Sequence, residues 1–450
     1  MGMTCPDYRV RLPLLVLALA MLCACQPAPE SEYRAAEGLL ARGRTDLAQA
    51  KLERLAADCP EFASANLLLG KLHLSRGNFP EAERRLAAGL AGRTGDFDHW
   101  IALARARLAL EQYPPALEAL DCAQAVARGP LEPLMARRWI AETSRLAQLN
   151  REMAEVALRF GRFADHVAAL DVFAAAAFER FDADLVALIN LHLAMIESFT
   201  RLNLPTRVES AWNQVFRLNN RRIQELEARL RARPDDLSRR MELASAHLSA
   251  AKRWAVVRKN QEKMEEHLLR ADPLLSSIIA LATETPSLRA RAAEGAVSLY
   301  LMRNRLDDAE LWITKAIEWD AQKPEYRYTR AQIEEQRGRP EAALASMQAY
   351  LAEASPTASA DAWLFWARLL RGAGRVEEAL AAADQAVARA SEEFQPRLVR
   401  IQLLLSAGRT GPARQAIVEL ARRDLDPPEM KQLHELQQLL LKLEAVPPPP

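Results

Sequence analysis

An alanine recurs at one place in a repeating unit of 34 residues, and this period constrains the fold more than any other feature of the chain. Within each of two groups the alanines are 34 residues apart, except for an interval of 36 residues between Ala343 and Ala379. Such a period predicts an array of helix pairs in which each pair packs only on its neighbours. The seven alanines are Ala48, Ala82, Ala116, Ala309, Ala343, Ala379 and Ala413.

Five of these alanines follow a glycine by five residues, which suits a turn between two helices because glycine reaches positive φ. The glycines are Gly43, Gly77, Gly338, Gly374 and Gly408, and the other two units have Glu111 and Asn304 at this place. Other positions of the unit are also spaced by 34 residues. They are Asn66, Leu69, Gly70, His73, Phe79 and Leu86 in the second unit, and Trp100, Leu103, Ala104, Arg107, Tyr113 and Leu120 in the third. This pattern resembles tetratricopeptide repeats. The resemblance implies an all-α solenoid, a right-handed superhelix of antiparallel helix pairs.

The repeat pattern divides the chain into segments. An N-terminal array occupies 33–130, with units starting near Pro29, Ala63 and Phe97, and a C-terminal array occupies 290–427, with units starting near Ala290, Pro324, Ala360 and Phe394. In 131–289 the signature fades while helical periodicity persists, so we expect four or five divergent helix pairs. The segment 428–445 predicts a capping helix, and 446–450 a disordered tail. The apolar stripe of the capping helix is Met430, Leu433, Leu436, Leu440 and Leu443.

Two local signals stand out in the divergent middle. Pro234-Asp-Asp-Leu237 predicts the end of one helix followed by the N-cap of the next. The stretch 237–270 contains neither Gly nor Pro, and so predicts either one long helix or a pair joined by an extended turn.

The first 24 residues have the organisation of a secretory signal. Arg9 and Arg11 precede an apolar run of about a dozen residues, which is shorter than the roughly 20 residues needed to span a bilayer. The following Leu22-Cys-Ala-Cys25 resembles the lipobox of bacterial lipoproteins. By that resemblance, 1–24 is cleaved, Cys25 is acylated, 25–32 is a lipidated tether, and the protein is anchored in the outer membrane facing the periplasm.

Composition and motifs argue against several other classes. The formal net charge of +1 gives no general basic bias toward nucleic acid. None of the seven histidines belongs to a metal-binding or HExxH pattern, and neither a phosphate loop nor a GxSxG motif is present. We therefore expect no catalytic residues, no metal and no cofactor, and interpret His73 and His247 as packing residues. Cys59 and Cys122 fall in repeats one and three, too far apart for a disulfide.

The resemblance also predicts a binding surface. In such arrays the first helix of each unit lines the concave face, where a mixture of apolar and arginine side chains suits a helix or an extended peptide. A second candidate is the arginine-rich stretch 217–240, which could contact an acidic partner or an anionic polysaccharide, or could form a solvated face balanced by nearby carboxylates. The predicted groove residues are Leu67, Lys71, Leu74, Ile101, Arg105 and Leu108 in the N-terminal array, and Tyr328, Glu335, Leu364, Arg368, Arg371 and Gln402 in the C-terminal array.

Taken together, the chain resembles tetratricopeptide lipoproteins of the bacterial outer membrane, which act as scaffolds for protein partners in the cell envelope. The run Ala65 to Asn78 is most similar to repeats of lipoproteins from exopolysaccharide and exosortase loci, which implies a role in exopolysaccharide export. Assembly of pili or of outer-membrane proteins is the alternative within this class. An α/α-toroid enzyme that degrades polysaccharide is the alternative of another class, and the 34-residue spacing argues against it.

Overall fold

The computed structural model describes residues 28–92, 96–128, 132–167, 174–423, 425 and 427–444. Within these ranges the chain forms helices α2 to α21 and no strand, which confirms the predicted all-α fold. The predicted signal peptide 1–24, the lipidation residue Cys25 and the predicted tail 446–450 lie outside the described residues.

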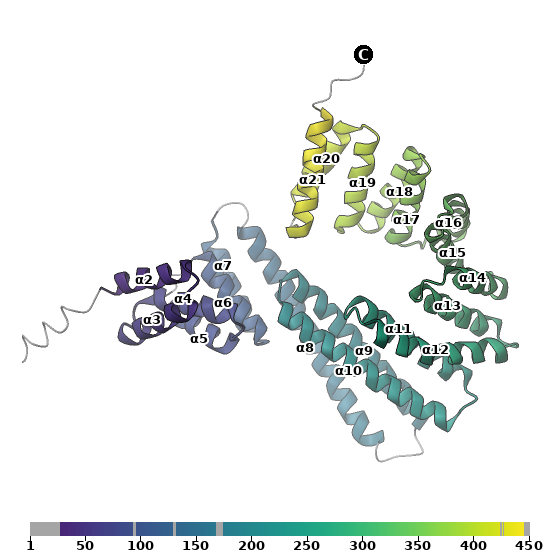
Figure 1. Cartoon of the computed structure of the whole chain (residues 1–450), viewed down its shortest axis with the longest axis horizontal. Helices are drawn as coiled ribbons and strands as arrows, with labels where there is room; N and C mark the ends of the chain where they lie inside the picture. Colours follow the sequence, from purple (N-terminus) through teal and green to yellow (C-terminus); the bar gives the residue numbers. More distant parts are fainter. Residues whose placement is uncertain are drawn as a thin grey trace, which may run out of the picture. The chain divides into compact units, whose positions relative to one another are not determined.

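The N-terminal array consists of three helix pairs (Figure 1). The first helices begin at Pro29, Ala63 and Phe97, where the repeat pattern places the unit starts. Because α2 begins at Pro29, the predicted tether 25–32 is too long at its C-terminal end, and 29–32 belong to the first helix. The pairs are α2 (Pro29–Ala41) with α3 (Thr45–Asp58), α4 (Ala63–Ser75) with α5 (Phe79–Leu90), and α6 (Phe97–Ala109) with α7 (Tyr113–Val126).

The repeated turn position has positive φ in all seven units. The five glycines there have φ between 69° and 76°, and the residues that replace glycine, Glu111 and Asn304, adopt φ of 60° and 55°. At the same relative position in each unit, this left-handed residue ends the first helix and reverses the chain. The turn is therefore preserved even where its preferred residue is not.

Small residues set the distance between the paired helices. All seven repeat alanines are fully buried. In the second unit, a Cβ added to Gly70 of α4 would lie 2.5 Å from Cγ of Leu86 on α5, closer than real Cβ contacts allow. Small residues at these positions therefore allow the two helices of a pair to approach closely.

The divergent middle differs from the prediction of four or five helix pairs. It contains three long helices, α8 (Glu132–Val167), α9 (Ala174–Arg201) and α10 (Pro205–Ala232), followed by one pair, α11 (Leu237–Val256) and α12 (Gln261–Leu281). Neither Gly nor Pro occurs between Ala174 and Pro205 or between Pro205 and Pro234, so nothing in the sequence breaks α9 or α10. For α9 and α10, long helices replace pairs because the turn residues are missing.

The two local predictions for the middle are both resolved. Asp236 caps α11, and its Oδ1 accepts a hydrogen bond from the backbone N–H of Arg239 at 3.1 Å, as the helix stop and N-cap predict. The stretch 237–270 is a pair rather than one long helix, with a turn at 257–260 in which Lys259 has φ of 49°.

The chain divides into two compact units, and the boundaries between them fall within α8, α9 and at α10. One unit comprises residues 1–155 with 194–210, and the other 156–193 with 211–450. By length and composition alone, Asp182–Arg201 of α9 would qualify as a membrane span. However, Asp182 forms two hydrogen bonds with Arg222 of α10, and 44% of the segment is buried, so we interpret it as a helix packed within the protein.

The C-terminal array contains four helix pairs and a final helix, stacked in chain order in Figure 1. Its unit starts agree with the prediction, except that α13 begins at Pro286, four residues before Ala290. The helices are α13 (Pro286–Met302) with α14 (Leu306–Trp319), α15 (Glu325–Gln336) with α16 (Pro340–Ala354), α17 (Ala360–Gly372) with α18 (Val376–Arg389), α19 (Phe394–Ser406) with α20 (Thr410–Ala421), and α21 (Pro427–Glu444).

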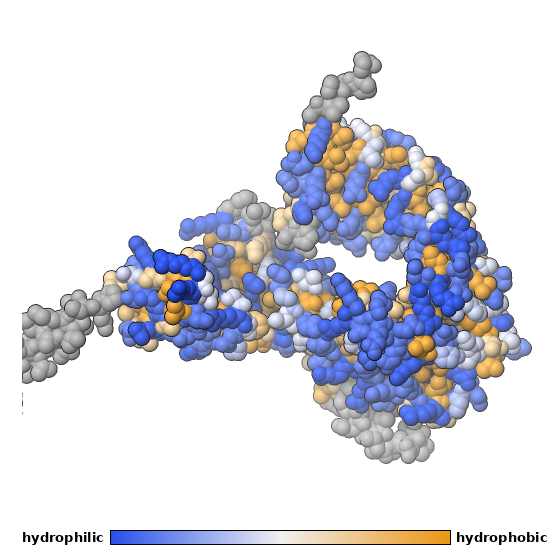
Figure 2. All heavy atoms as spheres, in the orientation of Figure 1, coloured by the Kyte–Doolittle hydropathy of each residue, from blue (hydrophilic) through white to orange (hydrophobic). Residues whose placement is uncertain are grey.

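Helix α21 caps this array as predicted. Leu433, Leu436 and Leu440 join the core formed by α17 to α20, whereas Met430 and Leu443, at the ends of the predicted stripe, are exposed. Figure 2 shows apolar residues at the surface over the C-terminal helices. The stripe therefore covers the end of the core only along its central turns.

Candidate protein-binding surface

Three predicted groove residues come together on the first helices of two consecutive C-terminal repeats. Arg368 of α17 donates from Nη2 to Oε2 of Glu335 on α15, with a distance of 2.9 Å. The guanidinium carbon of Arg368 lies 5.1 Å from the ring centroid of Phe365, and the ring of Tyr328 meets Phe365 edge to face at 5.7 Å. We call Tyr328, Glu335 and Arg368, together with Phe365 beneath them, the first-helix surface.

The tyrosine of this surface stays protonated at all physiological pH values. Burial raises the pKa of the Tyr328 hydroxyl, and the carboxylate of Asp361 raises it further. The phenol is half-buried, and its ring lies 5.3 Å from that of Tyr350. The surface thus combines an aromatic ring with a neutral hydroxyl, a carboxylate and a guanidinium, a mixture that suits recognition of a peptide.

The other predicted residues of the C-terminal array lie around this surface without joining it. Arg371 is exposed and forms no hydrogen bond or ion pair within the described part of the chain. Leu364 and Gln402 are half-buried. Arg371 therefore offers an uncommitted cation on the same helix as Arg368.

In the N-terminal array the prediction of a groove is wrong for three residues. Leu67, Ile101 and Leu108 are 7%, 6% and 0% exposed, so their side chains belong to the core and cannot meet a partner. Leu67 packs on Gly89, since a Cβ at that glycine would lie 2.7 Å from the leucine side chain. At the end of α6, Arg207 of α10 donates to the Leu108 carbonyl at 3.5 Å, which shows that a later helix covers this position.

The remaining N-terminal residues, Lys71, Leu74 and Arg105, are half-buried. Burial lowers the pKa of His99, and the nearby charge of Lys71 lowers it further. The Nε atom of Arg105 is buried without a hydrogen-bond partner in the described structure. None of the six predicted groove residues of the N-terminal array is exposed, whereas Arg368 and Arg371 of the C-terminal array are.

Much of the arginine-rich stretch serves the fold. Arg222 forms two hydrogen bonds with Asp182, at 2.6 and 2.9 Å, and Arg239 pairs with Asp236 at 3.2 Å. Arg240 donates to the carbonyl of Pro234, which closes the turn before α11. These contacts favour the interpretation of this stretch as a solvated face whose charges are balanced. Contact with an anionic polysaccharide stays a prediction, and the exposed side chains that could make it are Arg217, Arg231 and Arg233.

A pair of buried histidines was not anticipated. His247 of α11 is buried, as expected for a packing residue, and its Nδ1 lies 3.0 Å from Nδ1 of His267 on α12. Burial, and to a smaller extent the neighbouring His267, lower the pKa of His247 to about 4. The sequence gives no signal for this contact, because His247 and His267 are 20 residues apart and meet only through the turn at 257–260. No group of three or more metal-ligating side chains occurs among the described residues.

Comparison with known proteins agrees with the repeat pattern. Two family models, both described as tetratricopeptide repeat, match residues 39–105 and 328–394. These two segments are tetratricopeptide repeats, and arrays of this kind are in general non-catalytic scaffolds for protein interactions. No curated protein matches the sequence.

Solved structures of the same kind are similar to this chain. Yeast Tom70 is 14% identical over 92% of this chain and 96% of its own, with a TM-score of 0.30. A tetratricopeptide-repeat protein from Parabacteroides merdae is 12% identical over 83% of this chain and 98% of its own, with a TM-score of 0.29. YrrB, a repeat protein with an unusual peptide-binding site, is 14% identical over 49% of this chain and 98% of its own, with a TM-score of 0.33. Similarities at this level say nothing about a shared partner.

Proposed function

We propose that this protein is a lipid-anchored scaffold on the periplasmic side of the outer membrane, where it holds protein partners of an exopolysaccharide export system. The observation that carries the binding role is the first-helix surface, where Tyr328, Glu335 and Arg368 gather from two consecutive repeats. An arginine over an aromatic ring is a frequent anchor in protein interfaces. The anchor and the export role rest on the sequence, namely Leu22-Cys-Ala-Cys25 and the run Ala65 to Asn78.

Capture of a partner tests the binding role. Full-length protein is crosslinked in cells and purified from solubilised envelope, and captured proteins are identified by mass spectrometry. We expect Arg368→Glu to remove a component of an export system from the captured set. Arg409→Glu is the matched control, because Arg409 also forms an exposed ion pair between repeats, with Glu377 at 2.5 Å, but on second-helix elements. Equal capture by wild type and Arg368→Glu would assign the partner to another face.

The anchor has its own test. In cells that express Cys25→Ser, the protein is expected in the soluble periplasmic fraction, while the wild type stays with outer membranes. A variant of mature size that still sediments with membranes would remove the lipid as the main tether.

The export role is tested by deletion. Cells that lack the protein are expected to secrete less exopolysaccharide while keeping normal pili and normal amounts of outer-membrane proteins. Loss of pili or of outer-membrane proteins, with polysaccharide unchanged, would favour the alternative assembly roles. Degradation of polysaccharide by the purified protein would contradict the scaffold.

A further inference from the structure

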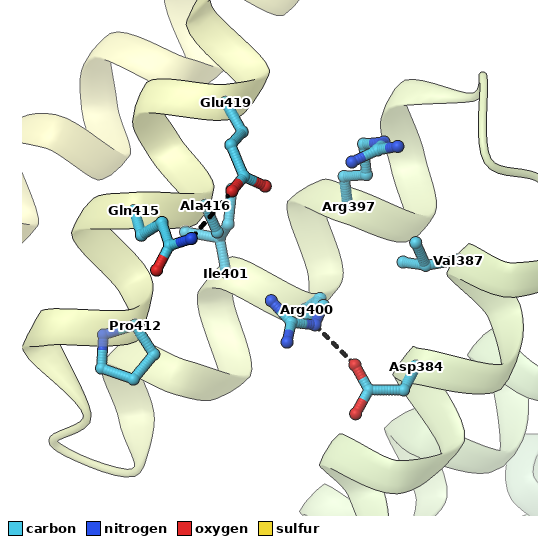
Figure 3. Close-up of a pocket in the computed structure, with 9 residues that line it drawn as sticks. All are labelled: Asp384, Val387, Arg397, Arg400, Ile401, Pro412, Gln415, Ala416 and Glu419. Carbon is cyan, nitrogen blue, oxygen red and sulfur yellow. Dashed lines mark hydrogen bonds and ion pairs between the residues drawn. The ribbon is translucent and has the colours of Figure 1, made fainter.

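A hollow of about 420 Å³ lies between the second helices α18 and α20, over the first helix α19 (Figure 3). Its volume is within the range of small-ligand sites in proteins. Residues of second helices form its two walls, so it is separate from the first-helix surface. The lining consists of Asp384, Val387, Arg397, Arg400, Ile401, Pro412, Gln415, Ala416 and Glu419.

The two arginines of the hollow occupy repeat positions at which the third unit has Trp100 and Leu103. The unit that starts near Pro324 has the same substitution, with Arg327 and Arg330. Arg327 and Arg397 make the same kind of hydrogen bond, each to the backbone carbonyl of the residue six places earlier. The distances are 3.1 Å from Arg327 to Ala321 and 2.8 Å from Arg397 to Ser391. The second arginine of each pair behaves differently, and this difference opens the hollow.

Arg330 reaches across to its own second helix, where its Nε donates to Oγ of Ser346 at 2.9 Å. The residue equivalent to Ser346 in the last unit is Ala416, three residues after the repeat alanine, and it offers no acceptor. Arg400 instead turns to the preceding second helix, where its Nε donates to Oδ1 of Asp384 at 2.5 Å. The space beside Ala416 and Pro412 therefore stays open, as Figure 3 shows.

The polar groups of the hollow have unused hydrogen-bonding capacity. Arg400 is held through Nε and Arg397 through Nε and Nη2, which leaves the Nη groups of Arg400 and Nη1 of Arg397 without a partner within the described structure. Guanidinium groups stay charged, and their existing bonds hold them in place before a ligand arrives. On the opposite wall, Gln415 donates to Oε1 of Glu419 at 3.0 Å, so that Oε2 remains an acceptor.

The apolar part of the lining indicates which kind of group would lie beside the arginines. Ile401 is buried beneath the hollow, and Val387, Pro412 and Ala416 surround it, which favours an aliphatic group. Asp384 is already paired with Arg400, whereas both Nη groups of Arg400 and Nη1 of Arg397 have no acceptor in the described structure. These free N–H groups favour an anionic acceptor such as a carboxylate.

We propose that this hollow binds a carboxylate of a partner peptide, with the adjoining backbone N–H donating to Glu419 and an aliphatic side chain resting on Val387 and Ile401. The carboxylate accepts hydrogen bonds from Arg400 and Arg397. A peptide C-terminus and an Asp or Glu side chain both present this chemistry. The site stands on its own contacts and does not depend on the first-helix surface.

The test uses three small probes with the full-length protein, titrated by ligand-observed NMR. N-acetyl-leucine represents a chain terminus, N-acetyl-glutamate α-methylamide represents an acidic side chain, and N-acetyl-leucinamide lacks the carboxylate. We expect at least one acid to bind and the amide not to bind, and the tighter acid identifies the source of the carboxylate. Binding of the amide as tight as that of both acids would overturn the proposal.

Two variants and a matched control locate the binding. Arg400→Gln is expected to weaken the acid about tenfold or more through loss of a charge-assisted contact. The released Asp384 is exposed, so the variant should fold, and its thermal melting curve checks this. Arg330→Gln changes the equivalent arginine where no hollow has formed, and should bind as the wild type does. Ala416→Ser supplies the acceptor that Ser346 provides in the earlier unit, and should also weaken binding. Undiminished binding by both Arg400→Gln and Ala416→Ser would refute the site.

Discussion

His247 and His267 face each other across α11 and α12 with 3.0 Å between their Nδ1 atoms, so one ring must donate and the other must accept. This contact requires at least one neutral imidazole on its acceptor side. The surrounding charged groups are Glu227 of α10, whose carboxylate lies 3.8 Å from Nε2 of His247, and Arg270 and Glu266 of α12.

The pair predicts that the protein loses stability in mild acid. The pKa of His247 is about 4 in the folded state against about 6.5 for an unfolded chain, so the unfolded state binds more protons between these values. Stability is therefore full above pH 6.5 and falls as pH decreases toward 4, by up to about 3 kcal/mol. Pairing of a protonated His247 with Glu227 would offset part of this loss.

Denaturant unfolding at pH 7.5, 6.0 and 5.0 measures the effect. His247→Gln keeps a polar side chain that does not titrate in this range, so the free energy of unfolding of this variant should depend less on pH. His434→Gln serves as control, since His434 is exposed on α21 and should leave the slope as in the wild type. Identical slopes for wild type and His247→Gln would show that the pair does not titrate as argued.

A second prediction concerns the left-handed turn residue. Gly374 has φ of 74°, and an L-residue there costs about 1 kcal/mol, so Gly374→Ala should lower the free energy of unfolding by that amount. Gly372, two residues earlier, ends α17, and Gly372→Ala should be neutral or stabilising. At neither glycine would a Cβ meet another atom within 4 Å, so the comparison isolates the backbone. Equal destabilisation of the two variants would contradict this explanation of the turn.

A third prediction concerns the repeat alanines. Ala379 of α18 is fully buried between paired helices, so Ala379→Leu should overpack the interface and destabilise the protein by about 1–3 kcal/mol. Ala381, two residues later on the same helix, is exposed, and Ala381→Leu should leave the thermal melting temperature nearly unchanged. If Ala379→Leu melts no lower than Ala381→Leu, the register of the repeat is wrong.

The sequence predicts the two arrays closely because each unit carries its own boundary signals. The spacing of the alanines places first helices at Ala63, Phe97, Ala360 and Phe394, and the structure begins α4, α6, α17 and α19 there. The 34-residue period gives no boundaries between 131 and 289, where α9 and α10 are long because neither Gly nor Pro interrupts them. The contact between His247 and His267 depends on how two helices pair, which no local pattern specifies.

Side-chain exposure was less predictable than helix position. Leu67, Ile101 and Leu108 are all buried, although the groove prediction placed them on the exposed face. Leu67 packs on Gly89 of the paired helix, and Arg207 of α10 contacts the carbonyl of Leu108. Tyr328, Glu335 and Arg368 were each predicted as groove residues. The ion pair between Arg368 and Glu335 was not predicted, because it depends on the distance between α15 and α17. The hollow at Ala416 could not be predicted from the sequence, because it depends on the different directions in which Arg330 and Arg400 turn.

The last prediction separates a structural from a binding role for the ion pair of the first-helix surface. Arg368 and Glu335 are 56% and 34% exposed, so their attraction is screened and contributes about 0–1 kcal/mol to stability. Arg368→Glu alone should therefore leave the melting temperature close to that of the wild type while it reduces capture of the partner.

Exchange of the two charges, Arg368→Glu with Glu335→Arg, restores an ion pair at the same place with opposite polarity. If the pair only stabilised the surface, this double variant would recover capture. Because a partner must complement the direction of the charges as well as their presence, we expect capture to remain lost, with unfolding like that of the wild type. Recovery of capture by the double variant would assign the ion pair to the fold and place the contact with the partner elsewhere on α15 and α17.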